Sequence, residues 1–249
     1  MAEAIRRHKE GYIITLMWHA VRPTEDEPVT FHDSIQGKLS AKEWDELVTD
    51  GTPLNTRWKT QVDVIARLLK QLQAAQVPVL WRPYHEMNGA WFWWGQKPGE
   101  NGYKRLYRML FDRLVHHHGL NNLIWVYNCN EASPGVDPYA AHYPGDDVVD
   151  ILATDVYRRG FAQDDYDSLK ALAGEKPIAL GEVGEPPPLE IFKTQPNWAW
   201  FMVWGEPQPF PKGPRPLPAN MERITEYSSD QILTLEELPW VKDKKPAGQ

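Results

Sequence analysis

Six short apolar segments alternate with longer segments of helical character along the 249 residues of the chain. Each apolar segment runs into polar or aromatic residues at its C-terminal end, as GYIITLMWH (11–19) does. The other five are VPVLWRPYHE (77–86), NLIWVYNCN (122–130), VVDILATDVY (148–157), KPIALGEVG (176–184) and WAWFMVWG (198–205). Strands that alternate with helices are typical of parallel α/β sheets. We therefore predict an α/β fold with these six segments as its strands.

Helical periodicity marks segments between the predicted strands. Leu106, Leu110 and Leu114 repeat every four residues in 102–119, and Gly119 suits the end of a helix. Further helices are expected over 165–173 and 219–228, and a polar loop is expected after the first strand. Residues 57–76 place five apolar side chains on one helical face: Val62, Ile65, Leu68, Leu69 and Leu72.

Strands that end in polar or aromatic residues favour a (β/α) barrel, because the active sites of such barrels lie at those strand ends. A doubly wound sheet is the alternative, and it usually carries a glycine-rich turn after its first strand. The residues MWHAVRP at this position are not such a turn. No boundary interrupts the pattern, so we predict a single domain over 1–249.

A proline-rich stretch, GEPQPFPKGPRPLP (205–218), follows the last predicted strand. We expect a stiff surface loop over the strand ends, because a strand and a helix flank it. Display as a polyproline II ligand is the alternative.

Composition argues against some classes of partner. The net charge is −7 and no basic stripe is present, so nucleic acid is not an expected partner. No stretch approaches the roughly 18 apolar residues of a membrane span. The one cysteine, Cys129, allows neither an intramolecular disulfide nor a cysteine-based metal site. The 12 tryptophans indicate either a bulky core or a flat-walled cleft of the kind that binds sugars.

The stretch RPYHEMNGAWFWWG (82–95) joins a His-Glu pair to a run of aromatic residues. A zinc protease motif needs a second histidine four residues after the first, but Gly89 follows His85 at that spacing. The histidines of 116–118 lie at a predicted helix end, where a solvated cluster is favoured over metal binding. We expect neither a metal nor an organic cofactor.

Glu86 and Glu182 are the candidate catalytic carboxylates. The tryptophans after Glu86 would desolvate it and raise its pKa, as a general acid requires. The alternative is a structural ion pair with Arg82. Glu182 ends a later strand, and residues at different strand ends of a barrel converge on one mouth. Glu185 is close by but lies past the strand, in a proline-rich loop.

Five of the six predicted strands end in groups that suit a sugar site. A tyrosine hydroxyl can orient a nucleophilic carboxylate, and an indole face can carry a pyranose ring. The expected substrate-binding residues are Trp18, His19, Arg82, His85, Trp91, Trp94, Asp155, Tyr157 and Trp204.

Six stretches resemble glycoside hydrolase family 26, whose best-known members are endo-β-1,4-mannanases. They are ITLMWH, VPVLWRPYHEMNGAWFWWG, GLNNLIWVYN, YPGDDVVDILATDVY, PIALGEVG and FMVW, between about residue 11 and Pro239. The resemblance implies a (β/α)8 TIM barrel and a retaining mechanism. It implies that Glu86 is the acid/base and Glu182 the nucleophile, and that Tyr157 contacts the nucleophile. It also implies substrate-site roles for His19, Trp91 and Trp204.

The sequence departs from the family pattern at its N-terminus. If Glu86 follows the fourth strand of the barrel, ITLMWH belongs to the third, and two βα units are absent. At about 30 residues for each unit, roughly 60 residues would be missing. We therefore expect an N-terminally truncated barrel, either a fragment or a misassigned start of a longer enzyme, with exposed apolar sheet edges.

The expected activity is that of a monomeric, retaining endo-glycosidase on β-1,4-mannan, glucomannan or galactomannan. Mixed-linkage β-glucan and β-1,3-xylan are alternative substrates within the family, and an inactive carbohydrate-binding remnant is an alternative of another class. A polymeric substrate implies secretion. The apolar run of MAEAIRRHKEGYIITLMWH is too short for a signal peptide, so the compartment stays open.

Overall fold

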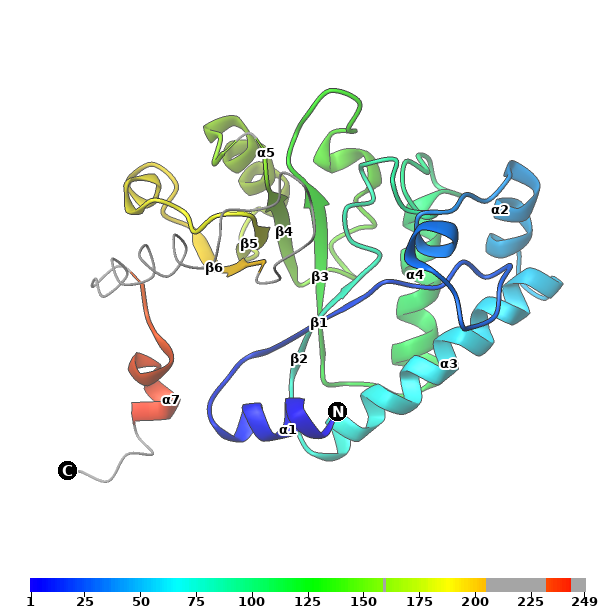
Figure 1. Cartoon of the computed structure of the whole chain (residues 1–249), viewed down its shortest axis with the longest axis horizontal. Helices are drawn as coiled ribbons and strands as arrows, with labels where there is room; N and C mark the ends of the chain where they lie inside the picture. Colours follow the sequence, from blue (N-terminus) through cyan, green and yellow to red (C-terminus); the bar gives the residue numbers. More distant parts are fainter. Residues whose placement is uncertain (159, 205–231, 243–249) are drawn as a thin grey trace.

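A parallel sheet of six strands forms the centre of the computed structural model, which describes residues 1–158, 160–204 and 232–242 (Figure 1). All six predicted strands are confirmed, with narrower bounds. They are β1 (Ile14–Trp18), β2 (Val79–Pro83), β3 (Leu123–Asn130), β4 (Ile151–Val156), β5 (Ile178–Val183) and β6 (Trp198–Val203).

The strands lie in sequence order from β1 to β6, and every neighbouring pair is parallel. A doubly wound sheet reverses its strand order at a switch point, and this sheet has no reversal. Sequential parallel order is the arrangement of a (β/α)8 barrel. The alternative of a doubly wound sheet is therefore wrong.

Burial differs between the centre and the edges of the sheet. Every residue of β2, β4 and β5 is buried, as expected for parallel strands covered on both faces. The edge strands β1 and β6 are mostly half-buried. The carboxylates considered below come from the well-covered central strands or the residues that follow them.

Three predicted helices are confirmed: α3 (Pro53–Ala74), α4 (Tyr103–Phe111) and α5 (Gln163–Ala173). The α3 helix begins earlier than predicted, because the Thr52 hydroxyl accepts a hydrogen bond from the Asn55 backbone N–H and Pro53 suits the first turn. The chain continues from α4 into a π-helical turn, η2 (Asp112–His117). In Figure 1, α3 and α4 lie on the same side of the strands.

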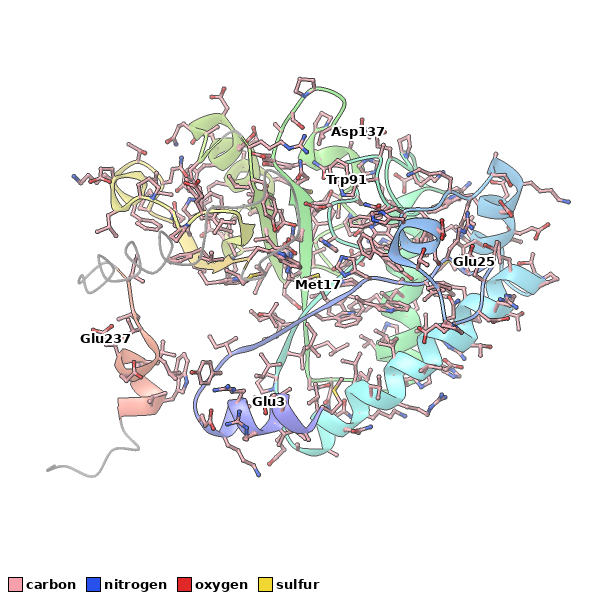
Figure 2. The ribbon with its side chains drawn as sticks, viewed as in Figure 1. Glu3, Met17, Glu25, Trp91, Asp137 and Glu237 are labelled. Atoms are coloured by element: carbon pink, nitrogen blue, oxygen red, sulfur yellow. The ribbon has the colours of Figure 1, made fainter. Side chains whose placement is uncertain are left out.

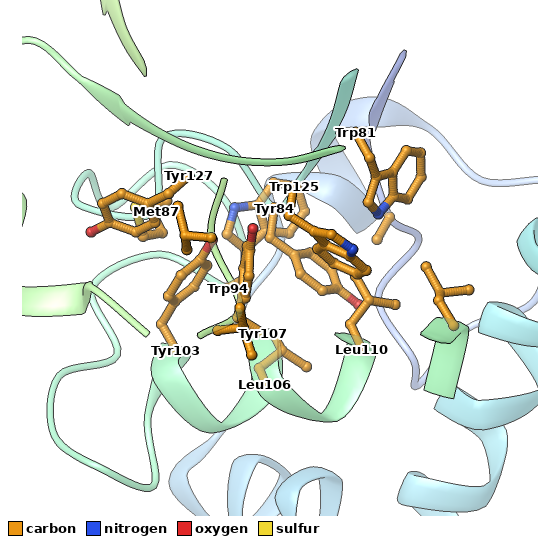
Figure 3. Packing of buried hydrophobic residues seen from close by; sticks show 14 of the residues in the cluster. Trp81, Tyr84, Met87, Trp94, Tyr103, Leu106, Tyr107, Leu110, Trp125 and Tyr127 are labelled. Atoms are coloured by element: carbon orange, nitrogen blue, oxygen red, sulfur yellow. The ribbon is translucent and has the colours of Figure 1, made fainter. Parts of the chain in front are cut away.

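An aromatic and aliphatic core fills the space between α4 and strands β2 and β3 (Figure 3). Leu106 and Leu110 of α4 are fully buried there, together with Trp125 of β3. Burial of one leucine side chain contributes about 1.5–3 kcal/mol to folding. Six of the 12 tryptophans are buried, so the tryptophan surplus serves the core as well as the strand ends.

Two helices of 8 residues each were not expected from the sequence. The region predicted as a polar loop contains α2 (Ala41–Val48), which begins with a reciprocal capping box between Ser40 and Glu43. Its Trp44 and Leu47 are buried. The helix α1 (Ala2–Lys9) buries no residue, and ion pairs such as Arg7 with Glu3 cross its surface.

The remaining elements are short. They are η1 (Phe31–Ile35), η3 (Tyr139–His142), η4 (Leu189–Lys193), η5 (Leu235–Glu237) and α7 (Pro239–Lys242). The predicted proline-rich loop over 205–218 and helix near 219–228 lie outside the described residues. Within the described ranges, no helix has both the length and the apolar character needed to cross a bilayer.

Candidate active site

A register shift between β4 and β5 brings Asp155 and Glu182 side by side. Thr154 pairs with Leu180, but Asp155 pairs with Glu182, so Gly181 is skipped. A Cβ on Gly181 would lie 1.9 Å from Asn128 Oδ1 and 2.8 Å from Asp155 Oδ1. The register shift therefore places the Asp155 and Glu182 carboxylates on the same side of the sheet end. A side chain at residue 181 would collide with Asn128 and Asp155, so glycine is needed there.

Arg82 of β2 connects the buried polar groups. Its Nη2 lies 3.1 Å from Glu182 Oε1 and 3.3 Å from Asp155 Oδ1, and its Nε donates to Asn128 Oδ1 at 2.8 Å. Arg82 and Asp155 are almost completely buried. Within the described part of the chain, Arg82 forms no ion pair with Glu86. The alternative of a structural Arg82–Glu86 pair is therefore wrong.

Glu182 is oriented by donors on both carboxylate oxygens. Arg82 donates to Oε1, and the Tyr157 hydroxyl donates to Oε2 at 2.7 Å. Burial and the adjacent Glu182 raise the pKa of Tyr157, so this phenol keeps its proton and acts as the donor. Tyr157 is also 42% exposed, so it reaches the surface from which a substrate would approach.

Glu86 follows β2 on a strained backbone. Its φ of 53° lies in the left-handed region, and its N–H donates to Asn128 O at 2.7 Å. For a residue other than glycine, this conformation costs on the order of 1–3 kcal/mol and persists only where the surroundings hold it. The chain therefore turns sharply at Glu86 and presents its side chain beyond the end of β2.

The Glu86 carboxyl group is largely withdrawn from water, and its Oε2 accepts a hydrogen bond from Trp91 Nε1 at 2.6 Å. Burial, and next the charge of Glu182, raise the pKa of Glu86 from 4.5 to about 7, although the Trp91 bond opposes this shift. Glu86 can therefore carry a proton near neutral pH, as a general acid must.

Two imidazoles lie beside the carboxylates. The rings of His19 and His85 are 4.8 Å apart and meet edge to face, and His85 Nε2 lies 3.9 Å from Glu182 Oε1. Burial lowers the pKa of His19, and burial together with Arg82 and His19 holds the pKa of His85 well below its usual value. Both rings are therefore neutral and can donate or accept one hydrogen bond on each nitrogen.

Trp94 differs from the sequence expectation. It is fully buried, donates from Nε1 to His85 O at 2.8 Å and stacks on Phe92 with ring centroids 4.5 Å apart. A buried ring offers no face to a sugar, so its expected substrate contact must be corrected to support of the His85 backbone. Arg82, His85 and Asp155 likewise lie behind the surface, where they can orient other groups.

The other expected tryptophans lie nearer the surface. Trp91 is half-buried. Figure 2 shows it near the upper end of the sheet. Trp18 is half-buried and packs on Tyr84, with centroids 5.4 Å apart. Trp204 follows β6, is half-buried, and its backbone N–H donates to Val183 O at 2.9 Å.

Two polar residues at the end of β3 escaped the sequence analysis. Asn128 bonds to Arg82 and to the Glu86 backbone, and Glu131 accepts hydrogen bonds from the backbone just after β4. The polar run NCNE at 128–131 was the available signal. The predicted strand ended at Asn130, so Glu131 lay one residue beyond it.

Two groups of described side chains bring metal-ligand atoms together. In one, Asp63 with His117 and His118, the Arg113 guanidinium already binds both Asp63 oxygens at 2.8 and 2.7 Å. His116 and His117 are exposed as expected, but His118 bonds to Asp63. The other group comprises His85, Glu86 and Asp155, where Arg82 bonds to Asp155.

This arrangement of carboxylates at the ends of sequential parallel strands agrees with a family comparison. The model of glycosyl hydrolase family 26 matches residues 2–213. The chain belongs to glycosyl hydrolase family 26.

Two curated relatives match over much of the chain. A mannan endo-1,4-beta-mannosidase of Thermothelomyces thermophilus is 38% identical, over 97% of this chain and 49% of its own length. A mannan endo-1,4-beta-mannosidase of Bacillus subtilis is 37% identical, over 80% of this chain and 57% of its own length. The chain thus spans about half the length of these relatives.

Two solved structures share the fold. GH26A from Muricauda sp. MAR_2010_75 is 51% identical with a TM-score of 0.88, covering 95% of this chain and 77% of that chain. A beta-mannanase from a symbiotic protist of the termite Reticulitermes speratus, complexed with gluco-manno-oligosaccharide, is 31% identical with a TM-score of 0.76. That match covers 95% of this chain and 72% of the other.

Proposed function

We propose that the chain is the catalytic region of a retaining endo-β-1,4-mannanase that acts on mannan, glucomannan or galactomannan. The observation that carries the proposal is the pairing of two carboxyl groups in different environments. Glu86 has a pKa raised to about 7, and Glu182 is oriented by Arg82 and Tyr157. The mannanase names of its relatives support the choice of substrate.

In the proposed first step, the Glu86 carboxyl group gives its proton to the glycosidic oxygen. A Glu182 oxygen attacks the anomeric carbon as the bond to the leaving sugar breaks, which forms a covalent glycosyl ester. Glu86, now ionised, then removes a proton from water, and the resulting nucleophile displaces Glu182. Retention requires carboxyl groups about 5–5.5 Å apart, and this separation stays a prediction.

The surrounding groups would hold the nucleophile and the sugar. Arg82 and Tyr157 would fix the Glu182 carboxylate, since each donates to a different oxygen. His19 would hydrogen-bond the sugar as a neutral ring. Trp91 and Trp204 would provide ring faces for pyranose units. This mechanism uses protein groups and water. The monomeric state of the enzyme remains a separate prediction.

We also propose that the six parallel strands belong to a (β/α)8 barrel of the family type. Their sequential parallel order supports this proposal. In that frame β2 would be the barrel's fourth strand, followed by Glu86, and β5 its seventh, which carries Glu182.

Release of reducing sugar from mannan, lichenan and β-1,3-xylan tests the function. We expect turnover of mannan at least about tenfold above the other two polymers. A preference for lichenan or β-1,3-xylan would replace the substrate assignment while preserving the mechanism. Binding of mannan without any release of reducing sugar would contradict the enzymatic proposal and favour a carbohydrate-binding protein.

A further inference from the structure

A buried carboxylate between the ends of β3 and β4 lies outside the catalytic pair. Glu131 follows the last residue of β3 and is 2% exposed. Its Oε1 accepts the backbone N–H of Tyr157 at 3.1 Å and of Arg158 at 2.7 Å. Its own N–H donates to Asp155 O at 2.9 Å. Glu131 thus connects the start of the loop after β3 to the first peptides after β4 by hydrogen bonds.

These first peptides determine where the Tyr157 side chain begins. The Tyr157 hydroxyl donates to Glu182 Oε2 at 2.7 Å, so a shift of its backbone would move a hydrogen bond to the proposed nucleophile. The neighbouring carbonyl is held differently, because Val156 O accepts from the Gly184 N–H at 3.0 Å. Gly184 also packs against the Tyr157 ring, where an added Cβ would lie 2.9 Å from Cδ1.

We propose that Glu131 is a positioning residue of the reaction. It holds the peptides after β4 so that the Tyr157 hydroxyl stays within hydrogen-bond distance of Glu182. A side-chain oxygen has two lone pairs and can accept two backbone N–H groups at once. Two such bonds to one oxygen fix the direction in which the chain leaves the strand. The inference rests on the proposed function, in which Glu182 is the nucleophile.

Three substitutions at Glu131 separate position from charge. E131A removes the acceptor, and we expect a kcat on mannan about 30- to 100-fold lower with KM within about threefold, because the misplaced group is the nucleophile and not a sugar-binding residue. E131Q keeps an oxygen acceptor of the same reach and should lose less than about fivefold in kcat. E131D keeps the charge but is one methylene shorter, and it should lose at least about tenfold.

A matched control comes from Asp150, whose Oδ2 accepts the Trp125 backbone N–H at 2.7 Å at the opposite end of the same strands. D150A breaks a similar bond away from the site and should change kcat less than about twofold. E131A with at least half of the wild-type kcat, or E131Q as impaired as E131A, would overturn the proposal. If E131A does not fold, an unchanged kcat in E131D would overturn it as well.

A double-mutant cycle tests the route of the effect. If Glu131 acts through Tyr157, E131A in a Y157F background should lower kcat by less than about threefold. If the double variant loses kcat by the product of the two single losses, Glu131 acts by another route, and the positioning role is refuted.

The order of measurements separates the two proposals. Wild-type turnover of mannan is measured first, and its absence would contradict the proposed function alone. Crystal structures of the wild-type protein and E131A then decide the positioning role without an assay. We expect the Tyr157 hydroxyl to leave hydrogen-bond distance of Glu182 in E131A, and an unchanged contact would overturn the inference.

Discussion

Glu86 and Glu182 are the same kind of side chain in two contrasting regions of one site. Glu86 follows β2 on an irregular backbone, and its carboxyl group is withdrawn from water and accepts a hydrogen bond from an indole. Glu182 lies within β5, where a guanidinium and a phenol each donate to one of its oxygens. The contrast teaches that the surroundings of each carboxyl group, and not its residue type, determine which one acts as the acid and which one as the nucleophile.

The two regions also depend on each other. The charge of Glu182 is the second cause, after burial, of the raised pKa of Glu86. The positive charge of Arg82 acts in the opposite direction on Glu86. Substitutions that alter one carboxyl group should therefore change the protonation of the other, and they provide ways to test the contrast.

The largest effect is expected for Glu182→Ala, which removes the nucleophile. Hydrolysis of mannan should fall by about 10⁴-fold or more, because the proposed glycosyl ester on Glu182 can no longer form. Reducing-sugar release from locust bean gum measures this loss. Glu185→Ala is the matched control, since this carboxylate lies three residues further along, beyond β5, and its loss should leave at least about half of the activity. A larger loss for Glu185→Ala than for Glu182→Ala would reverse the assignment.

Glu86→Ala should have a large effect that depends on the leaving group. Turnover of mannan should fall about 10²- to 10⁴-fold, because the departing sugar oxygen needs a proton. A dinitrophenyl mannoside leaves without protonation, so its release of dinitrophenol in the first turnover should fall much less. Stopped-flow absorbance measures that step. Equal losses on the polymer and the aryl substrate would rule out Glu86 as the acid.

The smallest effect concerns pH. Glu86 must be protonated to act as an acid, so kcat on mannan should decline as pH rises through about 7. The folded protein also holds this proton more tightly than the unfolded chain, whose carboxyl pKa is near 4.5. The stability that Glu86 contributes is thus fully present below about pH 4.5 and is lost as pH rises to about 7.

Glu86→Gln removes this titration. Its stability relative to the wild-type protein should therefore grow between about pH 4.5 and 7, by about 3 kcal/mol at most. Chemical unfolding at pH 4, 6 and 8 measures the difference. A constant difference across these three values would show that the Glu86 pKa is not raised in the folded protein.

Much of the fold could be predicted from the sequence, because apolar segments and helical periodicity are strong local signals. Strand ends in parallel sheets converge, so Glu86 and Glu182 could be chosen although they lie far apart in the chain. The α2 helix was missed because most of its region is polar, although the SAKE run contains a capping box.

The depth of each side chain could not be predicted. Trp94 and Trp91 belong to one aromatic run, yet one is fully buried and the other half-buried. Their difference depends on the irregular backbone after β2, which no periodicity describes. Asn128 and Glu131 were missed for a related reason, because each bonds to a backbone group that follows a neighbouring strand, Glu86 after β2 and Tyr157 after β4.

The left-handed backbone at Glu86 has a consequence for how this protein could be made more robust. Glycine adopts such a φ without strain, and it would also remove a carboxyl group that is hard to ionise. Glu86→Gly therefore satisfies the local preferences of the chain better than the native residue does. Selection for thermal resistance alone would favour a change at the acid, so activity and stability oppose each other at this single position.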